Sequence, residues 1–213
     1  EKELNRDVCV ITNGFDPGVF PTTDPVAEET FTILLAGTIN PRRLTPVPLL
    51  KAIESAIIKG RIPEDRIHVR LLGPTSKSVS GFALDQFKRV SYSLEQRIAH
   101  KDALLQQMQS SALLLLTYPD EPGILTGKLF DYLGAGRPIL AIPDDRGSIS
   151  QLLSETGAGI SVTTCTEIEN LLVEWFQLWE KDKAFNLQRN DLAIRSYSRK
   201  EQAKQMAALL NSL

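Results

Sequence analysis

The sequence predicts an α/β fold, a Rossmann-like parallel sheet with helices on both faces. Three observations lead to this prediction. Short apolar runs recur along the 213 residues, and amphipathic stretches separate most of them. The run over 112–117 is apolar almost throughout, which is typical of a strand buried on both faces. Strands that alternate with helices form a parallel sheet with a helical layer on each side.

Seven apolar runs are expected to form strands. Gly37 ends one of them and Gly73 another. Pro138 opens a third, and the first position of a strand tolerates its missing N–H group. In chain order the predicted strands are 8–11, 32–36, 67–72, 89–92, 112–117, 138–142 and 159–162.

Helices are expected where apolar residues recur every three or four positions. Leu49 and Ile53 belong to such a stripe, and Gly60 ends it. Ser198 and Glu201 form a capping box at the start of the last helix. The predicted helices are 46–59, 80–88, 98–110, 127–135, 148–155, 167–182 and 198–213.

The chain divides into three parts. Residues 15–30 are rich in proline and acidic residues and lack periodicity, which is typical of a linker. We therefore expect a hinge or linker segment with one short strand over 1–30, a Rossmann-like domain over 31–197 and a C-terminal helix over 198–213.

Composition excludes several classes of protein. With 42% apolar and 23% charged residues, the chain is neither disordered nor a coiled coil. A net charge of −2 offers no basic excess for nucleic acid or an anionic membrane surface. The two cysteines are too few for a disulfide framework, so a reducing cytoplasm is the expected location. His68 and His100 lack partners at metal-ligand spacing, and His100 is interpreted as a surface residue.

The loops that leave strands are the expected ligand sites, because open α/β sheets bind ligands beyond the carboxyl ends of their strands. After the strand at 32–36, Gly37 lets the backbone turn close to a ligand. Arg42 and Arg43 follow, and their guanidinium groups suit phosphate. The alternative is a plain glycine turn with two solvated arginines.

The loop over 118–128 leaves the most buried strand and leads into a helix. Free N–H groups and the helix dipole make such a helix start an anion site. Thr126 adds a hydroxyl and Lys128 a positive charge, although no Walker sequence is present. Asp131, one turn later, can accept hydrogen bonds from sugar hydroxyls. The alternative is an acid favoured by the helix dipole and an outward lysine. The loop over 143–148 fits ordinary helix capping.

Four segments occur in an order that a known enzyme family shares. They are Val10–Asp16, Ile33–Ile39, Val69–Pro74 and Thr126–Leu140. The last is the longest and the most specific, and resembles the family's K-l-f-E-y-l-a-a-G-k-P signature. From about residue 8 to its end, the chain resembles the C-terminal, nucleotide-sugar-binding half of a retaining, group 1 type glycosyltransferase with the GT-B fold.

This resemblance implies roles for individual residues. Gly37 and Thr38 match the loop that faces the donor diphosphate, although the family usually has an arginine at the position of Thr38. Arg42 or Arg43 matches a basic residue that binds phosphate. Asp131 matches the glutamate that holds the nucleotide ribose, and it is one methylene shorter.

The same resemblance implies further donor contacts. Gly123 stands where the family has a glutamate that touches the donor sugar, and Glu121 is expected to substitute for it. The nucleobase is expected against the backbone at 90–92, including Tyr92. The backbone amides expected to meet the diphosphate are those of Leu125, Thr126 and Gly127.

The expected function is donor binding in an enzyme that moves a sugar from a nucleotide-diphosphate sugar to an acceptor. Lys128 and Arg42 are the expected catalytic residues, stabilising charge on the departing diphosphate without a metal or other cofactor. The resemblance implies that the acceptor-binding half is missing from this chain. Any membrane contact, at the inner face of the membrane, is then expected through that half. The chain alone is expected to bind nucleotide without transferring sugar.

Two other functions stay open. One is a non-catalytic nucleotide-binding or interaction module. The other is one half of a nucleotide-sugar epimerase.

Overall fold

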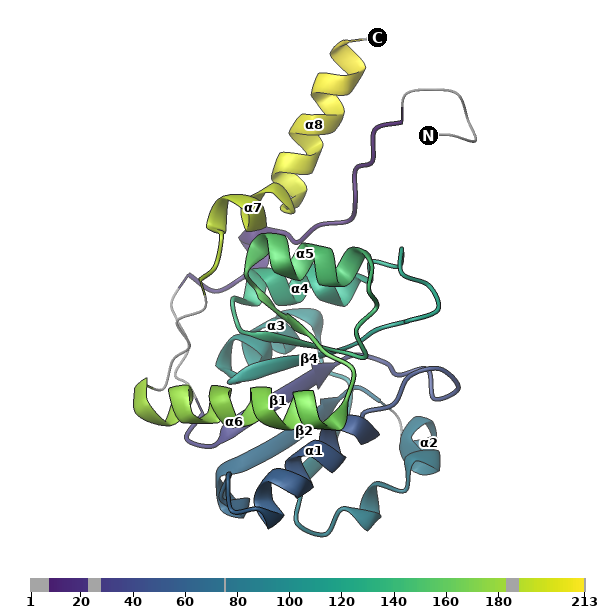
Figure 1. The fold of residues 1–213 in the computed structure, drawn as a ribbon. Coiled ribbons are helices and arrows are strands. Elements are labelled where there is room, and N and C mark those ends of the chain that lie inside the picture. The colour runs from purple at the N-terminus through teal and green to yellow at the C-terminus, as the bar shows by residue number, and fades with distance from the viewer. Residues whose placement is uncertain (1–7, 23–27, 75, 183–187, 213) are drawn as a thin grey trace.

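A six-stranded parallel sheet forms the centre of the molecule (Figure 1). The computed structural model describes residues 8–22, 28–74, 76–182 and 188–212. The strand order is β3-β2-β1-β4-β5-β6, so the direction in which the sheet grows reverses between β1 and β4. The strands are β1 (Phe31–Ala36), β2 (Ile67–Leu72), β3 (Tyr92–Glu95), β4 (Ala112–Leu116), β5 (Ile139–Ile142) and β6 (Gly159–Ser161).

Helices cover both faces of this sheet (Figure 1). On one face α1 (Val47–Ile58) packs against α6 (Cys165–Asp182). On the other lie α3 (His100–Gln109), α4 (Gly127–Ala135) and α5 (Ser148–Thr156). Every side chain of β1 and β4 is buried, as expected for central strands between two helical layers. The predicted fold class is confirmed.

A buried carboxylate links the end of α1 to α6. Glu169 is 3% exposed and accepts hydrogen bonds from Ser55 Oγ at 2.7 Å, Lys59 Nζ at 2.8 Å and Arg61 Nη1 at 2.7 Å. Burial opposes its ionisation, but the hydrogen bonds from Lys59, Ser55 and Arg61 outweigh burial and lower the pKa of Glu169 to about 2. We call these four residues the Glu169 cluster.

Most element predictions are confirmed, and β2 and α4 have the predicted bounds. The strand predicted over 89–92 is displaced, because β3 begins only at Tyr92. This shift matters for the site, since it moves the carboxyl end of β3 to Glu95.

The helix predicted over 80–88 is wrong. The short α2 (Ser76–Val79) is followed by two turns of 3-10 helix, and between them Ala83 has a left-handed φ of 47°. Leu84 and Phe87 are buried in the core there, so tertiary packing overrides the helical pattern. The 3-10 turns of the chain are Pro17–Val19, Glu64–Arg66, Ser80–Phe82 and Leu84–Gln86.

The strand predicted over 8–11 is also wrong, because these residues form no strand and Val10 is 76% exposed. The segment instead runs beside α8 (Arg199–Asn211), which α7 (Asp191–Ser196) precedes (Figure 1). The capping box of α8 is confirmed in part, since Ser198 accepts a hydrogen bond from the backbone N–H of Glu201.

Both ends of the described chain meet in a contact that we call the terminal clasp. It joins Asn13–Phe15 to Ser198–Gln202. Phe15 forms a parallel β-bridge with Ser198. Arg199 Nε donates a hydrogen bond to Gly14 O at 3.0 Å, and Gln202 Nε2 donates one to Asn13 O at 2.8 Å.

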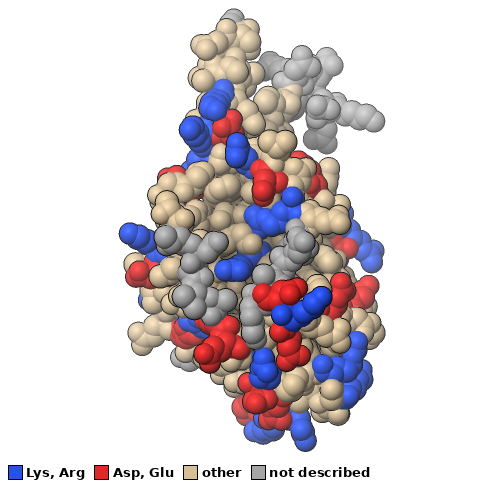
Figure 2. Space-filling view, turned by 90° about the vertical axis from the view of Figure 1, so that its left-hand side faces the viewer, with Lys and Arg blue, Asp and Glu red and all other residues tan. Residues whose placement is uncertain are grey.

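The surface mixes charges of both signs over the face shown in Figure 2. Among the described residues, no helix is long and apolar enough to cross a membrane.

Candidate functional site

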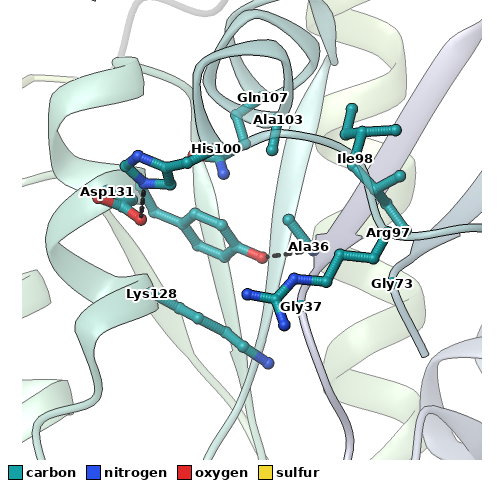
Figure 3. A pocket seen from close by; sticks show the side chains of 12 residues that line it. Ala36, Gly37, Gly73, Arg97, Ile98, His100, Ala103, Gln107, Lys128 and Asp131 are labelled. Atoms are coloured by element: carbon teal, nitrogen blue, oxygen red, sulfur yellow. Dashed lines mark hydrogen bonds and ion pairs between the residues drawn. The ribbon is translucent and has the colours of Figure 1, made fainter. Parts of the chain in front are cut away.

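A cavity of about 160 Å³ lies at the carboxyl ends of β1 and β2, between α3 and α4 (Figure 3). We call it the main pocket. Ala36 and Gly37 line it from β1, and Leu72 and Gly73 from β2; the segment between β3 and α3 and side chains of α3 and α4 complete it. It lies where the strand order reverses, the position at which open α/β sheets bind ligands.

Two glycines let the backbones of β1 and β2 meet tightly at this pocket. Gly37 has φ +99° and Gly73 has φ +98°, conformations that favour glycine. A Cβ on Gly37 would lie 2.7 Å from Lys128 Cε, and one on Gly73 would lie 3.4 Å from Gly37 Cα. The space beside Gly37 is therefore already occupied by the Lys128 side chain.

Lys128 lines the main pocket from the first turn of α4. Its Nζ donates a hydrogen bond to the carbonyl oxygen of Thr38 at 2.6 Å. Burial lowers the pKa of Lys128 to about 8. Among the described residues no carboxylate pairs with this ammonium group. An anion in the pocket would compensate for that deficit of negative charge.

The N-terminus of α4 offers further donors next to Lys128. The first N–H groups of a helix have no intrahelical partner. Thr126 occupies the N-cap position but makes no side-chain cap hydrogen bond. Its Oγ1 is buried and has no partner among the described residues. Together with Gly127 at the first helical position, this is an open anion-binding helix start.

Asp131 and His100 pair across the pocket, one from α4 and one from α3. His100 Nε2 lies 3.0 Å from Asp131 Oδ2 (Figure 3). The His100 side chain is 64% exposed, so the pair stands at the mouth of the pocket. One carboxylate oxygen is held by the ring, and the other stays available to a ligand hydroxyl. His100 was interpreted from the sequence as a surface residue, and the structure adds that it lines the pocket.

The inner end of the pocket is mostly apolar, with two polar groups. Tyr132 is fully buried, and its hydroxyl accepts a hydrogen bond from the backbone N–H of Ala36 at 2.9 Å. Burial raises the pKa of this hydroxyl well above its ordinary value. Gln107 is 3% exposed, and its Oε1 has no hydrogen-bond partner among the described residues.

Arg97 is a candidate that the sequence reasoning missed. It lies two residues beyond β3 and lines the main pocket. Figure 3 shows its guanidinium group directed into the pocket, on the side of Gly37 and Lys128. The signal was the alternation of Tyr92 and Leu94 with polar neighbours, which places the end of the strand at Glu95.

Several predicted residues lie elsewhere. Arg43 forms an ion pair with Glu121, and its guanidinium carbon lies 4.6 Å from the centroid of the Tyr118 ring. Each is therefore the other's partner, outside the main pocket. Arg42 is exposed in a turn and does not line the pocket.

The remaining predicted contacts divide in the same way. Gly123 is exposed, with nothing near the position of a Cβ. Leu125 packs against the core beneath α4. Tyr92 stands at the amino end of β3, away from the pocket, so the base contact expected at 90–92 is wrong in position. Thr38 contributes its carbonyl oxygen to Lys128 and lines a neighbouring hollow.

Within the described residues, no group of three His, Cys, Asp or Glu side chains could hold a metal ion. The polar groups of the main pocket are thus two cations, a helix N-terminus, one carboxylate–imidazole pair and one amide. Such a set suits an anionic ligand that also carries hydroxyl groups.

No protein-family model and no curated protein matches the chain. Solved structures do match. The Anabaena protein HepE, solved in complex with UDP-glucose, is 16% identical with a TM-score of 0.65, over 96% of this chain and 57% of that one. Sucrose-phosphate synthase from Thermosynechococcus elongatus is 15% identical with a TM-score of 0.65, over 95% of this chain and 51% of that one.

A third match is the pneumococcal O-GlcNAc transferase GtfA, solved with UDP and GlcNAc. It is 11% identical with a TM-score of 0.60, over 95% of this chain and 38% of that one. The chain therefore spans about 38–57% of the length of these proteins. At these identities the likeness shows the fold. The chain has the fold of one Rossmann-like half of GT-B glycosyltransferases, as the resemblance predicted.

Proposed function

We propose that the main pocket binds the nucleoside diphosphate of a nucleotide sugar, and that this chain is the donor-binding half of a glycosyltransferase. One observation carries the proposal. Lys128 and the uncapped start of α4 converge beside Gly37 at the point where the strand order reverses. That arrangement offers charge and N–H donors to a phosphate group and leaves no carboxylate to compete.

The cationic end of the pocket suits the chemistry of sugar transfer. When the bond between sugar and diphosphate breaks, negative charge grows on the departing phosphate oxygens. Preorganised donors aimed at that charge lower the barrier. Lys128, the helix N–H groups and Arg97 can supply them, and this set requires no metal ion. Arg97 takes the role expected for Arg42, which does not line the pocket.

The Asp131–His100 pair is the proposed ribose contact. The pair stands one helical turn from Lys128, close enough for a ribose to follow the diphosphate. A carboxylate oxygen of Asp131 accepts from a ribose hydroxyl. The imidazole holds the carboxylate in place and compensates for the shorter side chain.

Two of the structural neighbours support a uridine nucleotide as the first ligand to test. HepE was solved with UDP-glucose and GtfA with UDP. Because this chain spans 38–57% of their length, transfer to an acceptor is proposed only for a protein that contains the remaining part. The chain alone is expected to bind UDP without turnover.

The test is calorimetric titration of the chain with UDP. Wild type is expected to bind, and Lys128→Ala to lose more than tenfold in affinity, because hydrogen bonds to charged groups contribute about 1.5–3 kcal/mol. Lys51→Ala is the matched control, because Lys51 is exposed on α1 and far from the pocket in sequence and element. Its affinity should equal that of wild type.

Two results would contradict the proposal. If no nucleoside diphosphate binds wild type, the chain is better explained as an interaction module. If the chain alone transfers glucose from UDP-glucose, the donor pocket stands but the division of labour is wrong.

A further inference from the structure

Gln107 is an unexplained polar group at the inner end of the main pocket. It is 3% exposed, it lines the pocket, and its Oε1 has no partner among the described residues. Buried polar atoms in native proteins nearly always have a hydrogen-bond partner. A buried acceptor left open toward a cavity is therefore a place for a ligand donor.

Helix geometry directs this amide toward the mouth of the pocket. His100, Ala103 and Gln107 lie on one face of α3, at spacings of three and four residues. With a rise of 1.5 Å per residue, Gln107 starts about 10 Å deeper than His100. Side chains on a helix tilt toward its N-terminus, so the amide points back toward His100. The small Ala103 leaves room between them, and all three residues line the pocket (Figure 3).

The order of groups in the pocket then assigns the occupant of the inner end, on the basis of the proposed function. The diphosphate lies at Gly37 and Lys128, and the ribose at Asp131 and His100. The nucleobase extends from the other side of the ribose, over Ala103. Its far edge then faces the Gln107 amide.

We infer that Gln107 determines base specificity, by accepting a hydrogen bond from a ring N–H of the nucleobase. Uracil, thymine and guanine carry such an N–H beside a carbonyl group. Cytosine and adenine have an unprotonated nitrogen at the corresponding place, which repels an acceptor. A site built to hydrogen-bond one group discriminates strongly against an analogue that lacks it, because its buried polar atom is then left unpaired.

The experiment compares four nucleotides on wild type by calorimetry: UDP, CDP, GDP and ADP. Within each ring size one member has the N–H and the other does not, so ring size and edge chemistry separate. UDP is expected to bind at least tenfold more tightly than CDP. If purines enter the pocket, GDP is expected to exceed ADP in the same way.

Two variants connect the preference to this residue. Gln107→Met keeps the length of the side chain and removes its hydrogen bonds. It should lose at least fivefold in UDP affinity and bring UDP and CDP within twofold of each other. Its melting temperature should equal or exceed that of wild type, because an unpaired buried polar group is removed. Gln106→Met, at the neighbouring position of α3 and outside the pocket, should keep the wild-type ratio.

The outcomes distinguish this inference from the function on which it rests. If none of the four nucleotides binds wild type, both fail. If UDP binds and depends on Lys128, but CDP binds equally well, only the role of Gln107 is overturned. The same holds if the preference for UDP survives in Gln107→Met.

Discussion

The Glu169 cluster and the main pocket treat their charges in opposite ways. In the cluster, a carboxylate that is 3% exposed receives hydrogen bonds from Ser55, Lys59 and Arg61. In the pocket, Lys128 reaches only a backbone carbonyl. The effect on acidity follows, with a lowered pKa for both groups but for opposite reasons: hydrogen bonds favour ionised Glu169, and burial disfavours ionised Lys128. Charges that are satisfied within the chain stabilise the fold, whereas unsatisfied ones are left for a ligand.

The largest expected effect comes from breaking the satisfied region. Glu169→Ala should lower the free energy of unfolding by about 1.5–3 kcal/mol, because it removes hydrogen bonds to charged groups. UDP affinity of the folded variant should not change. Urea unfolding followed by circular dichroism measures the first, and calorimetry the second. Glu174→Ala, exposed on the same helix, is the control and should leave stability unchanged.

The same carboxylate predicts a pH window for stability. Its pKa is near 4.3 in an unfolded chain and about 2 in the folded one. Its contribution is therefore complete above pH 4.5 and is lost as the pH falls toward 2. Wild type should lose more stability over this range than Glu169→Ala. Parallel pH dependences of the two proteins would contradict the assignment.

The next effect compares two glycines, one in the pocket and one outside it. Gly37→Ala should cost roughly 1–2 kcal/mol of stability, since Gly37 has φ +99°. It should also abolish UDP binding, because the new Cβ takes the place of the Lys128 stem. Gly123→Ala should be neutral in thermal melting and in titration, as nothing lies within 4 Å of its Cβ position. Equal behaviour of the two variants would count against a constrained pocket.

A smaller effect should appear as pH dependence in the pocket alone. The protonated form of Lys128 is the one that binds phosphate, and the pKa of Lys128 is about 8. UDP affinity should therefore fall by at most about tenfold between pH 7 and pH 9. In Lys128→Arg the guanidinium stays charged, so the decline should vanish. A wild-type affinity that is flat across this range would exclude Lys128 from phosphate binding.

The smallest effect concerns Arg43, which the sequence reasoning placed at the phosphate. In the structure it pairs with Glu121 at the surface and stacks on Tyr118. Exposed pairs of this kind contribute little to stability. Arg43→Ala should change UDP affinity by less than twofold in the same titration. A loss comparable to that of Lys128→Ala would restore Arg43 to the site.

Elements of the fold could be predicted where apolar runs end sharply. Glycines follow β1 and β2 directly, and the α4 stripe stops at Gly136. β3 was displaced because its residues, Tyr92 to Glu95, are half-exposed and partly polar. Residues 8–11 have the composition of a strand but no neighbouring strand to pair with.

The candidate site was predictable only in the loops attached to those elements. Gly37, Thr126, Lys128 and Asp131 follow directly from where β1 and β4 end. Gln107 and His100 depend instead on which face of α3 turns toward α4, a property of packing and not of local pattern. The Arg43–Glu121 pair joins flexible side chains 78 positions apart, and no periodicity encodes it.

The terminal clasp has a mechanical consequence. Because Phe15 and Ser198 lie side by side, the chain enters and leaves the domain at one place, and residues 8–12 and α8 extend from the same side of the sheet (Figure 1). Tension applied between these two segments acts on the clasp first and leaves the six strands unloaded. A domain held in this way behaves as a rigid block on a two-stranded tether. It can be joined to another module, or swing relative to it, without any change in the sheet that shapes the pocket.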